Sequence, residues 1–363
     1  MNVTDKLYTE WAWRTESGVP DINNPKDKAT LDRLISELVT EQEESPYKVL
    51  QANLKKIAND KEAIDYINRY VNHRNHREPF NEYVTKKQID DSTIGDFSAP
   101  DAIFNILSKN NDVENFLTNL EKLPGFGSLG TSGNLLDKLK GIVSNDSIAA
   151  LINLGGQEEG RGVGKAEIAL ATLCSDVKMM KNQAGDLDWN GYLEVKGTSA
   201  RLGKRDHSFT GSPKIVQLAQ SSNIEDEKFG RTSVYNAPEA LITQLTKAKV
   251  PNETILNSLK EDLNPIYGEA LDLITTSNLN NLNVVLRQVY FKSYWMREGV
   301  NHIIFVNSNP KVGNLGKFLS VNLEQGLSYI ASNPTSFCSP IRFNALAPNV
   351  FRNGVGEVIK EDE

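Results

Sequence analysis

The segment from Gly185 to Gly197 carries the residues of this chain best suited to chemistry. It reads GDLDWNGYLEVKG and contains three acidic residues and one lysine. An Asn-Gly dipeptide between two short runs of alternating residues predicts a β-hairpin. Carboxylates on one face of a hairpin can bind Mg²⁺, and a lysine beside a metal-bound water can assist hydrolysis. This segment is therefore the first candidate for a catalytic site.

The register of the hairpin decides which side chains share a face. A two-residue loop would pair Leu187 with Glu194 and would mix acidic and aliphatic side chains on both faces. A three-residue loop over residues 189–191, with the glycine left-handed, instead pairs Leu187 with Leu193. We expect the three-residue loop, because it gives the hairpin an apolar face that includes Val195 and a separate charged face.

The charged face would carry Asp186, Asp188, Glu194 and Lys196. In the three-residue-loop register Asp186 lies directly opposite Glu194, at about 5 Å, so their carboxylates could share one Mg²⁺. Asp188 lies nearer the turn and is expected to be more exposed. An exposed strand face joined by salt bridges, without metal, is the open alternative.

A helix is expected from Lys165 to Val177, because its apolar residues recur at helical spacing. Glu167 borders the apolar stripe of this helix. A buried carboxylate there would need a hydrogen-bond partner, an ion-pair partner or a metal. The alternative is an acid near a helix N-terminus, where the helix dipole favours negative charge.

Together these residues resemble the PD-(D/E)xK nuclease superfamily, which has the restriction-endonuclease-like fold. The resemblance covers residues 164–197 and rests on three pieces. They are Glu167 in the helix GKAEIALATL, Asp186 in GDL, and the E-x-K strand LEVKG with Glu194 and Lys196. Gly185 stands where the literal motif has proline.

The resemblance implies an α/β (α+β) fold, in which a restriction-endonuclease-like mixed sheet is flanked by helices. The family pattern would continue with a helix over residues 282–298, ended by Gly299, and a strand over residues 302–307. Leu282, Val285, Val289 and Met296 would form the apolar stripe of that helix. Residues from about 203 to 278 would then be a large insertion.

The resemblance also implies Mg²⁺-dependent hydrolysis of DNA phosphodiester bonds, with Mn²⁺ as a substitute, in restriction, repair, recombination or phage DNA processing. Asp186, Glu194 and the carbonyl of Val195 would be metal ligands, Glu167 would act through a metal-bound water, and Lys196 would orient the attacking water. The alternative function is a nucleic-acid-binding or virion-associated structural protein that retains a nuclease fold.

Basic and aromatic residues elsewhere allow two further expectations. A local group of basic residues lies in a chain of net charge −7 and could contact DNA phosphates, although a solvated loop is the open alternative. These residues are Arg201, Lys204 and Arg205. Four aromatic residues of the later helix could stack on bases, but aromatics at helical spacing are more often core residues. They are Tyr290, Phe291, Tyr294 and Trp295.

Two other patterns carry no chemistry. The glycine-rich stretch before Lys165 is not a phosphate-binding loop, because Glu159 stands where that motif needs glycine and Ala166 where it needs Ser or Thr. Cys174 and Cys338 are far apart and outside any metal-ligand spacing, so we expect reduced core residues.

The domain organisation follows from helical periodicity before a glycine-rich stretch at residues 124–133. Residues 1–130 are expected to form a helical domain that contacts a second copy of the chain or a phage or host protein, and residues 131–363 the nuclease-like core. A chain beginning near residue 131 should then fold alone. No apolar run is long enough to span a membrane and no signal-peptide pattern is present, so a cytoplasmic or virion-associated protein is expected.

Overall fold

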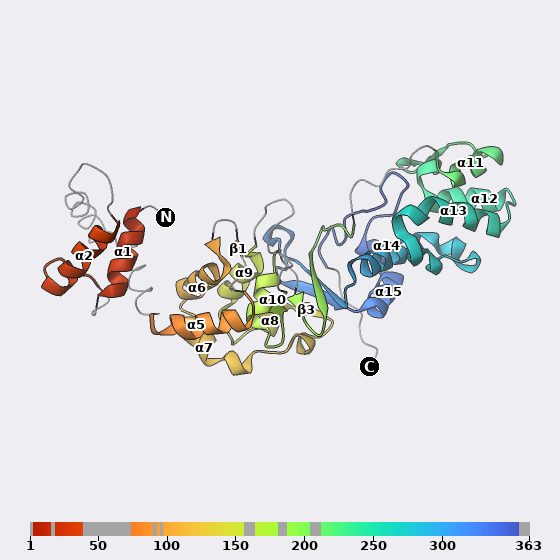
Figure 1. Ribbon diagram of the computed structural model, residues 1–363. Coiled ribbons are helices and arrows are strands. Elements are labelled where there is room, and N and C mark those ends of the chain that lie inside the picture. The colour runs from red at the N-terminus through yellow and green to blue at the C-terminus, as the bar shows by residue number, and fades with distance from the viewer. Residues whose placement is uncertain are drawn as a thin grey trace, which may run out of the picture.

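The computed structural model describes residues 3–15, 19–38, 74–89, 93–94, 97–155, 164–180, 187–203 and 212–355. Within these ranges the chain is a mixed α/β protein built around a six-stranded mixed sheet (Figure 1). None of the helices described is long and apolar enough to cross a membrane. The α/β class expected from the sequence is confirmed at this level.

The sheet has the strand order β3-β10-β9-β6-β5-β4. Its strands are β3 (Ser132–Asn134), β4 (Lys178–Met179), β5 (Leu187–Asp188), β6 (Tyr192–Gly197), β9 (His302–Val306) and β10 (Lys317–Val321). Strands β6 and β9 are parallel, and the other neighbouring pairs are antiparallel. β6 and β9 therefore form the centre of the sheet, with an antiparallel meander on one side.

Strand β9 shows why the centre of the sheet is stable. Its last four residues, IIFV, are all buried, so both of its faces are covered. A continuous run of branched and aromatic residues is typical of a strand that is buried on both faces. Alternate residues of the neighbouring strand β6 face opposite sides, which divides the hydrophobic interior into two cores.

The amino-terminal core lies on the sheet face that carries Leu193, Val195 and Ile304. The helices that contribute to this core are α5 (Arg74–Lys86), α6 (Ala99–Lys109), α7 (Val113–Thr118), α8 (Leu135–Lys138), α9 (Asn145–Asn153) and α10 (Glu167–Leu173). Helix α6 has a capped start, because Ser98 accepts a hydrogen bond from the Asp101 amide and a proline follows in the first turn.

The carboxy-terminal core lies on the opposite face, which carries Ile303 and Phe305. Helices α14 (Leu282–Glu298) and α15 (Leu323–Ser332) cover this face, and Figure 1 shows them on the side of the sheet away from α8 and α10. The bounds of α14 match the predicted helix, and Gly299 ends it with a left-handed φ of 65°. Met296, predicted in its apolar stripe, is 44% exposed, so that assignment is wrong.

The segment predicted as an insertion lies between β6 and α14 in the chain. It contains α11 (Lys214–Ser221), the hairpin of β7 (Lys228–Phe229) and β8 (Thr232–Ser233), α12 (Pro238–Lys247) and α13 (Asn252–Tyr267). Buried residues of these helices belong to the same carboxy-terminal core as α14. The insertion therefore packs on the helix that leads back into the sheet.

Helices α1 (Val3–Arg14) and α2 (Pro25–Leu38) pack on each other around a small core of their own. Trp11 is fully buried in it, and its indole Nε1–H donates to the Asp27 carbonyl at 2.7 Å. A helical domain was predicted over residues 1–130, and α1 and α2 are helices of that segment. Residues 39–73 of the same segment lie outside the described residues.

The hydrophobic core does not divide at residue 130, where the sequence predicted a domain boundary. Phe80, Phe104 and Phe116 lie in the same core as Leu193 and Ile304 of the sheet. The glycine-rich stretch belongs to the same packed body, because Phe126 and Leu129 within it lie in this core and strand β3 at its end joins the main sheet beside β10. Glycine content indicates a turn and says nothing of what packs around it.

A buried lysine ties the early helices to α10. Lys87 follows α5 and is only 5% exposed, and its ammonium donates to the carbonyls of Cys174, Ser175 and Val177. These carbonyls end α10 and begin the turn to β4, and Lys87 supplies the donors that a helix C-terminus lacks. Both cysteines, Cys174 and Cys338, are free and buried, as predicted.

A chain that begins at residue 131 is expected not to fold, contrary to the sequence-based expectation. It lacks three nearly fully buried phenylalanines. Each Phe→Ala change in a core costs about 3 to 5 kcal/mol, so the combined loss of about 9 to 15 kcal/mol is as large as the whole stability of a typical domain, roughly 5 to 15 kcal/mol. A chain that begins at residue 74 keeps these residues and should melt cooperatively by circular dichroism. Cooperative melting of the shorter chain would refute the shared core.

Lys87→Met is expected to lower the free energy of unfolding by about 2 to 4 kcal/mol, because three carbonyls lose their donor. Burial lowers the pKa of Lys87 from 10.5 to about 8. Between these values the unfolded chain binds more protons than the folded one, so the stability difference between native protein and Lys87→Met should grow as pH rises. Urea unfolding of both proteins at pH 7 and pH 10 measures this, and a difference that shrinks would contradict it.

Candidate active site

The hairpin of β5 and β6 has the predicted three-residue loop. Leu187 pairs with Leu193 and Asp188 with Tyr192, which excludes the two-residue loop. The Trp189 amide donates to the Gly191 carbonyl at 2.9 Å, and Gly191 has the positive φ, 114°, that the turn needs. Asp188 is exposed, as expected for its place beside the turn. Asp186 lies outside the described residues.

Glu194 is the buried acid of this hairpin. Its carboxylate accepts hydrogen bonds from Tyr192 Oη at Oε2 and from Tyr294 Oη at Oε1, the latter at 3.0 Å, and Lys196 Nζ forms an ion pair with Oε1. The side chain of Glu194 is 7% exposed and that of Lys196 is 26% exposed. Three donors from two elements therefore hold one carboxylate.

The face that carries Glu194 and Lys196 is largely covered. The sequence suggested a charged face of the hairpin, with a solvent-exposed, salt-bridged strand as the alternative to a metal site. In the structure Leu193 and Val195 face the amino-terminal core as predicted, whereas Tyr192 packs against the carboxy-terminal core and Glu194 meets Tyr294 of α14. A fully exposed strand face does not describe this side of β6.

The ring of Tyr294 lies between two cations. Lys196 Nζ is 5.5 Å from the ring centroid and Arg297 Cζ is 5.3 Å from it, both within cation–π range. Burial raises the pKa of Tyr294, and the charge of Glu194 raises it further. Tyr294 therefore keeps its proton and remains a hydrogen-bond donor to Glu194.

Glu167 is the first residue of α10 and is buried. Its Oε2 accepts a hydrogen bond from the Gly164 amide at 2.8 Å, so the side chain folds back over the start of its own helix. The interpretation as an acid near a helix N-terminus therefore has direct support. Helix α10 covers the face of Leu193, and Glu194 leaves β6 on the opposite face, so these two acids are on different sides of the sheet.

The other predicted site residues are placed only in part. Val195 lies in the middle of β6 and pairs with Ile304 of β9. Arg201 is exposed, and its Nε donates to Asn349 Oδ1 at 2.8 Å. Lys204 and Arg205 lie outside the described residues. The structure thus brings Glu194, Val195 and Lys196 together on one strand and leaves the remaining predicted ligands unplaced or apart.

No three His, Cys, Asp or Glu side chains among the described residues come together as a metal site would require. The predicted site includes Asp186, to which this finding does not extend. The donor types present, carboxylate and carbonyl oxygens, are the ligands that Mg²⁺ and Mn²⁺ prefer. Glu194 and the Val195 carbonyl are therefore chemically suited to such an ion, and Asp186 would have to complete the set.

The turn of the hairpin is fixed by a cluster around Trp189. Its ring packs on Phe126 at 4.6 Å and on His302 at 5.2 Å between centroids, and its Nε1–H donates to Asp176 Oδ2 at 2.9 Å. Burial lowers the pKa of His302 to about 4, so this histidine is neutral near pH 7 and adds no charge to the cluster. The cluster holds the turn against the body of the protein.

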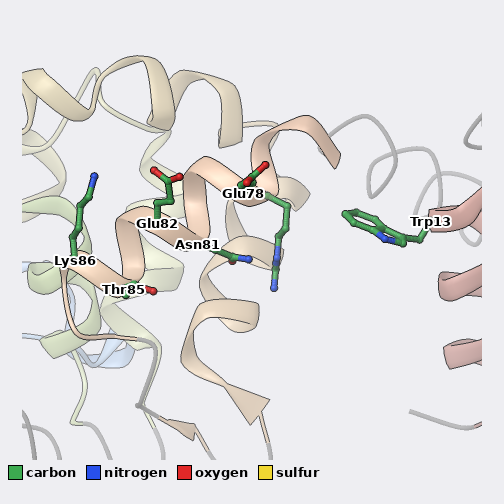
Figure 2. Close-up of a pocket in the computed structure, with 7 residues that line it drawn as sticks. Trp13, Glu78, Asn81, Glu82, Thr85 and Lys86 are labelled. Atoms are coloured by element: carbon green, nitrogen blue, oxygen red, sulfur yellow. The ribbon is translucent and has the colours of Figure 1, made fainter.

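A hollow of about 840 Å³ lies apart from these residues, between α1 and α5. Figure 2 shows Trp13 of α1 across from the side chains of α5. Its charged lining residues are of both signs, with Glu78 and Glu82 beside Arg77 and Lys86. Such a mixed lining selects no particular ligand charge, so the hollow does not compete with Glu194 as a catalytic candidate.

No family model, curated protein or solved structure matches this chain. Its function must therefore be inferred from its own residues.

Two residues of the site, Tyr192 and Tyr294, were not recognised from the sequence. Tyr192 could have been, because it lies two residues before Glu194 and so shares its strand face. Tyr294 was assigned to the core, and it is buried there. Only the packing of α14 on β6 brings its hydroxyl to a residue that is one hundred positions earlier in the chain.

Gly191→Ala is expected to destabilise the hairpin by more than about 1 kcal/mol, because alanine disfavours the positive φ and its Cβ would lie 2.4 Å from Asn301 Oδ1. Gly230→Ala is the matched control, since Gly230 has a φ of 62° and open space around it. Urea unfolding should show the larger loss for Gly191→Ala. Equal losses would mean that the Asn301 contact does not constrain the turn.

Proposed function

We propose that this chain is a divalent-metal-dependent nuclease that hydrolyses phosphodiester bonds of DNA. The observation that carries the proposal is the buried Glu194 carboxylate in the middle of β6, paired with the partly exposed Lys196 and beside a parallel strand. Helix α10, the meander β4-β5-β6, helix α14 and parallel strand β9 follow in the chain order expected of a restriction-endonuclease-like core.

The burial of Glu194 supports a functional interpretation. Removing a carboxylate from water costs several kcal/mol, and its attraction to a cation often fails to repay that cost. An apolar pair at these positions would extend the hydrophobic face toward α14 without that cost. Buried ionisable groups with a specific partner are over-represented at functional sites, which favours catalysis over a purely structural ion pair.

The proposed roles follow from what each group can do. Asp186, Glu194 and the Val195 carbonyl would hold Mg²⁺ or Mn²⁺. The metal would supply charge neutralisation and an acidified water. Lys196, with its ammonium partly exposed beside Glu194, would orient the attacking water and hold a proton near the scissile phosphate. Because α10 covers the other face of the sheet, the role that the sequence suggested for Glu167 is not part of this proposal.

Binding of DNA would use cations at the edge of the site. Arg201 is exposed and oriented by Asn349, and Arg297 is exposed at the end of α14 beside Tyr294. Lys204 and Arg205 follow Arg201 in sequence and would add charge. Such contacts bind phosphates without regard to base sequence, so the proposal concerns backbone binding.

One observation favours the alternative of a nucleic-acid-binding or virion-associated structural protein. The Glu194 carboxylate already has three donors, and the Glu167 carboxylate already accepts a backbone hydrogen bond. A site that is satisfied without metal could be retained for the fold alone. This alternative expects DNA binding that a chelator does not alter, and no cleavage.

The test is incubation of the purified chain with circular and linear DNA, with Mg²⁺ or with a chelator. Cleavage should require the metal. Lys196→Ala should lower the cleavage rate by about 100-fold or more, since it removes the group that serves the water. Cleavage in chelator, or an undiminished rate for Lys196→Ala, would reject the mechanism.

Asp186 and Asp188 provide a matched pair of variants in the same experiment. Asp186→Asn should abolish metal binding measured by calorimetry. The Leu187–Leu193 pair is that of the three-residue-loop register, in which Asp186 is expected opposite Glu194. Asp188→Asn should have a small effect, since Asp188 is exposed and pairs with Tyr192. A silent Asp186→Asn would remove Asp186 from the proposed ligands.

A further inference from the structure

Two tyrosine hydroxyls converge on the two oxygens of Glu194 from different elements. Tyr192 belongs to the same strand and donates to Oε2, and Tyr294 belongs to α14 and donates to Oε1. A glutamate side chain has three rotatable bonds, and a hydrogen bond at each oxygen fixes the rotation of the carboxylate plane. The carboxylate is therefore held in one orientation before any ligand binds.

The arrangement leaves acceptor capacity on the carboxylate. An ionised carboxylate has about four lone-pair sites, and each tyrosine uses one of them. Lys196 takes one more at Oε1. Oε1 therefore has both of its sites occupied, by Tyr294 and Lys196, whereas Oε2 keeps one lone pair that can bind a cation while Tyr192 orients it.

Tyr294 is itself held rigidly. Its side chain is buried, and Lys196 and Arg297 approach its ring within cation–π range. The hydroxyl sits at the end of a rigid ring and has little freedom, so it can fix the position of Glu194 Oε1 closely. Tyr192 is less buried and lies beside the hairpin turn, so Tyr294 is the stronger anchor.

We infer that Tyr294 is a positioning residue that, with Tyr192, orients the Glu194 carboxylate for binding of a divalent cation. This inference rests on the proposed function and adds to it a determinant outside the E-x-K motif. Tyr294 reaches the metal only through Glu194, so it is neither a ligand nor a catalytic residue.

The chain supplies a matched control on the same helix. Tyr290 lies one turn before Tyr294 and is also buried, but its hydroxyl accepts from the Leu202 amide and donates to the Pro348 carbonyl. A Tyr→Phe change at either position removes one buried hydroxyl from α14. Only the change at Tyr294 removes a donor from Glu194.

The experiment measures Mn²⁺ affinity by calorimetry and Mg²⁺-dependent DNA cleavage for the native chain, Tyr294→Phe and Tyr290→Phe, with thermal unfolding as a check of folding. Tyr294→Phe should weaken Mn²⁺ binding by about 10- to 100-fold and lower kcat with KM for DNA unchanged. Tyr290→Phe should keep native Mn²⁺ affinity and kcat. Tyr192→Phe, at a partly exposed position, should weaken Mn²⁺ binding in the same direction and serves if Tyr294→Phe does not fold.

The outcomes separate this inference from the proposed function. If the native chain binds Mn²⁺ and cleaves DNA, but both Tyr294→Phe and Tyr192→Phe match it, the positioning role is overturned and the nuclease proposal stands. Equal losses for Tyr290→Phe and Tyr294→Phe would mean that a general loosening of α14 is responsible, which also overturns it. If the native chain neither binds Mn²⁺ nor cleaves DNA, both proposals fall.

Discussion

Strands β6 and β9 run parallel, and a parallel pair cannot be joined by a tight turn. The chain must leave the end of β6, travel the length of the sheet and re-enter at the start of β9. Helix α14 makes the final part of that return and lies across the face from which Glu194 projects. The crossover that a parallel pair requires therefore brings α14 over the hairpin and β9 beside it.

The same requirement accommodates the long helical segment between β6 and α14. A crossover connection must be long, so helices added between β6 and α14 lengthen a path that already exists. These helices share the carboxy-terminal core with α14 and support it from the side away from the sheet. The position of Tyr294, and through it that of Glu194, thus depends on packing that begins well outside the hairpin.

The sequence predicted those features that depend on neighbouring residues. The hairpin register followed from the alternation of Leu187, Leu193 and Val195, and α14 from its periodicity and the glycine that ends it. Long-range packing was not predictable in this way. Nothing in the local pattern of residues 74–129 reveals that Phe80 and Phe104 meet the sheet, and a stripe at helical spacing did not reveal that Met296 faces solvent. Within the site, the sequence identified the E-x-K strand but neither tyrosine that meets Glu194. Tyr294 was not predictable from local pattern, because another element contributes it.

The strand order also has a consequence for how the chain is made. On the ribosome β6 emerges about a hundred residues before its partner β9. The separation in sequence between β3 and its partner β10 is longer still. The meander β4-β5-β6 can form early from local contacts, but its open edge and its charged face stay uncovered until the later part arrives. Such an edge can pair with other chains until β9 arrives and fills it.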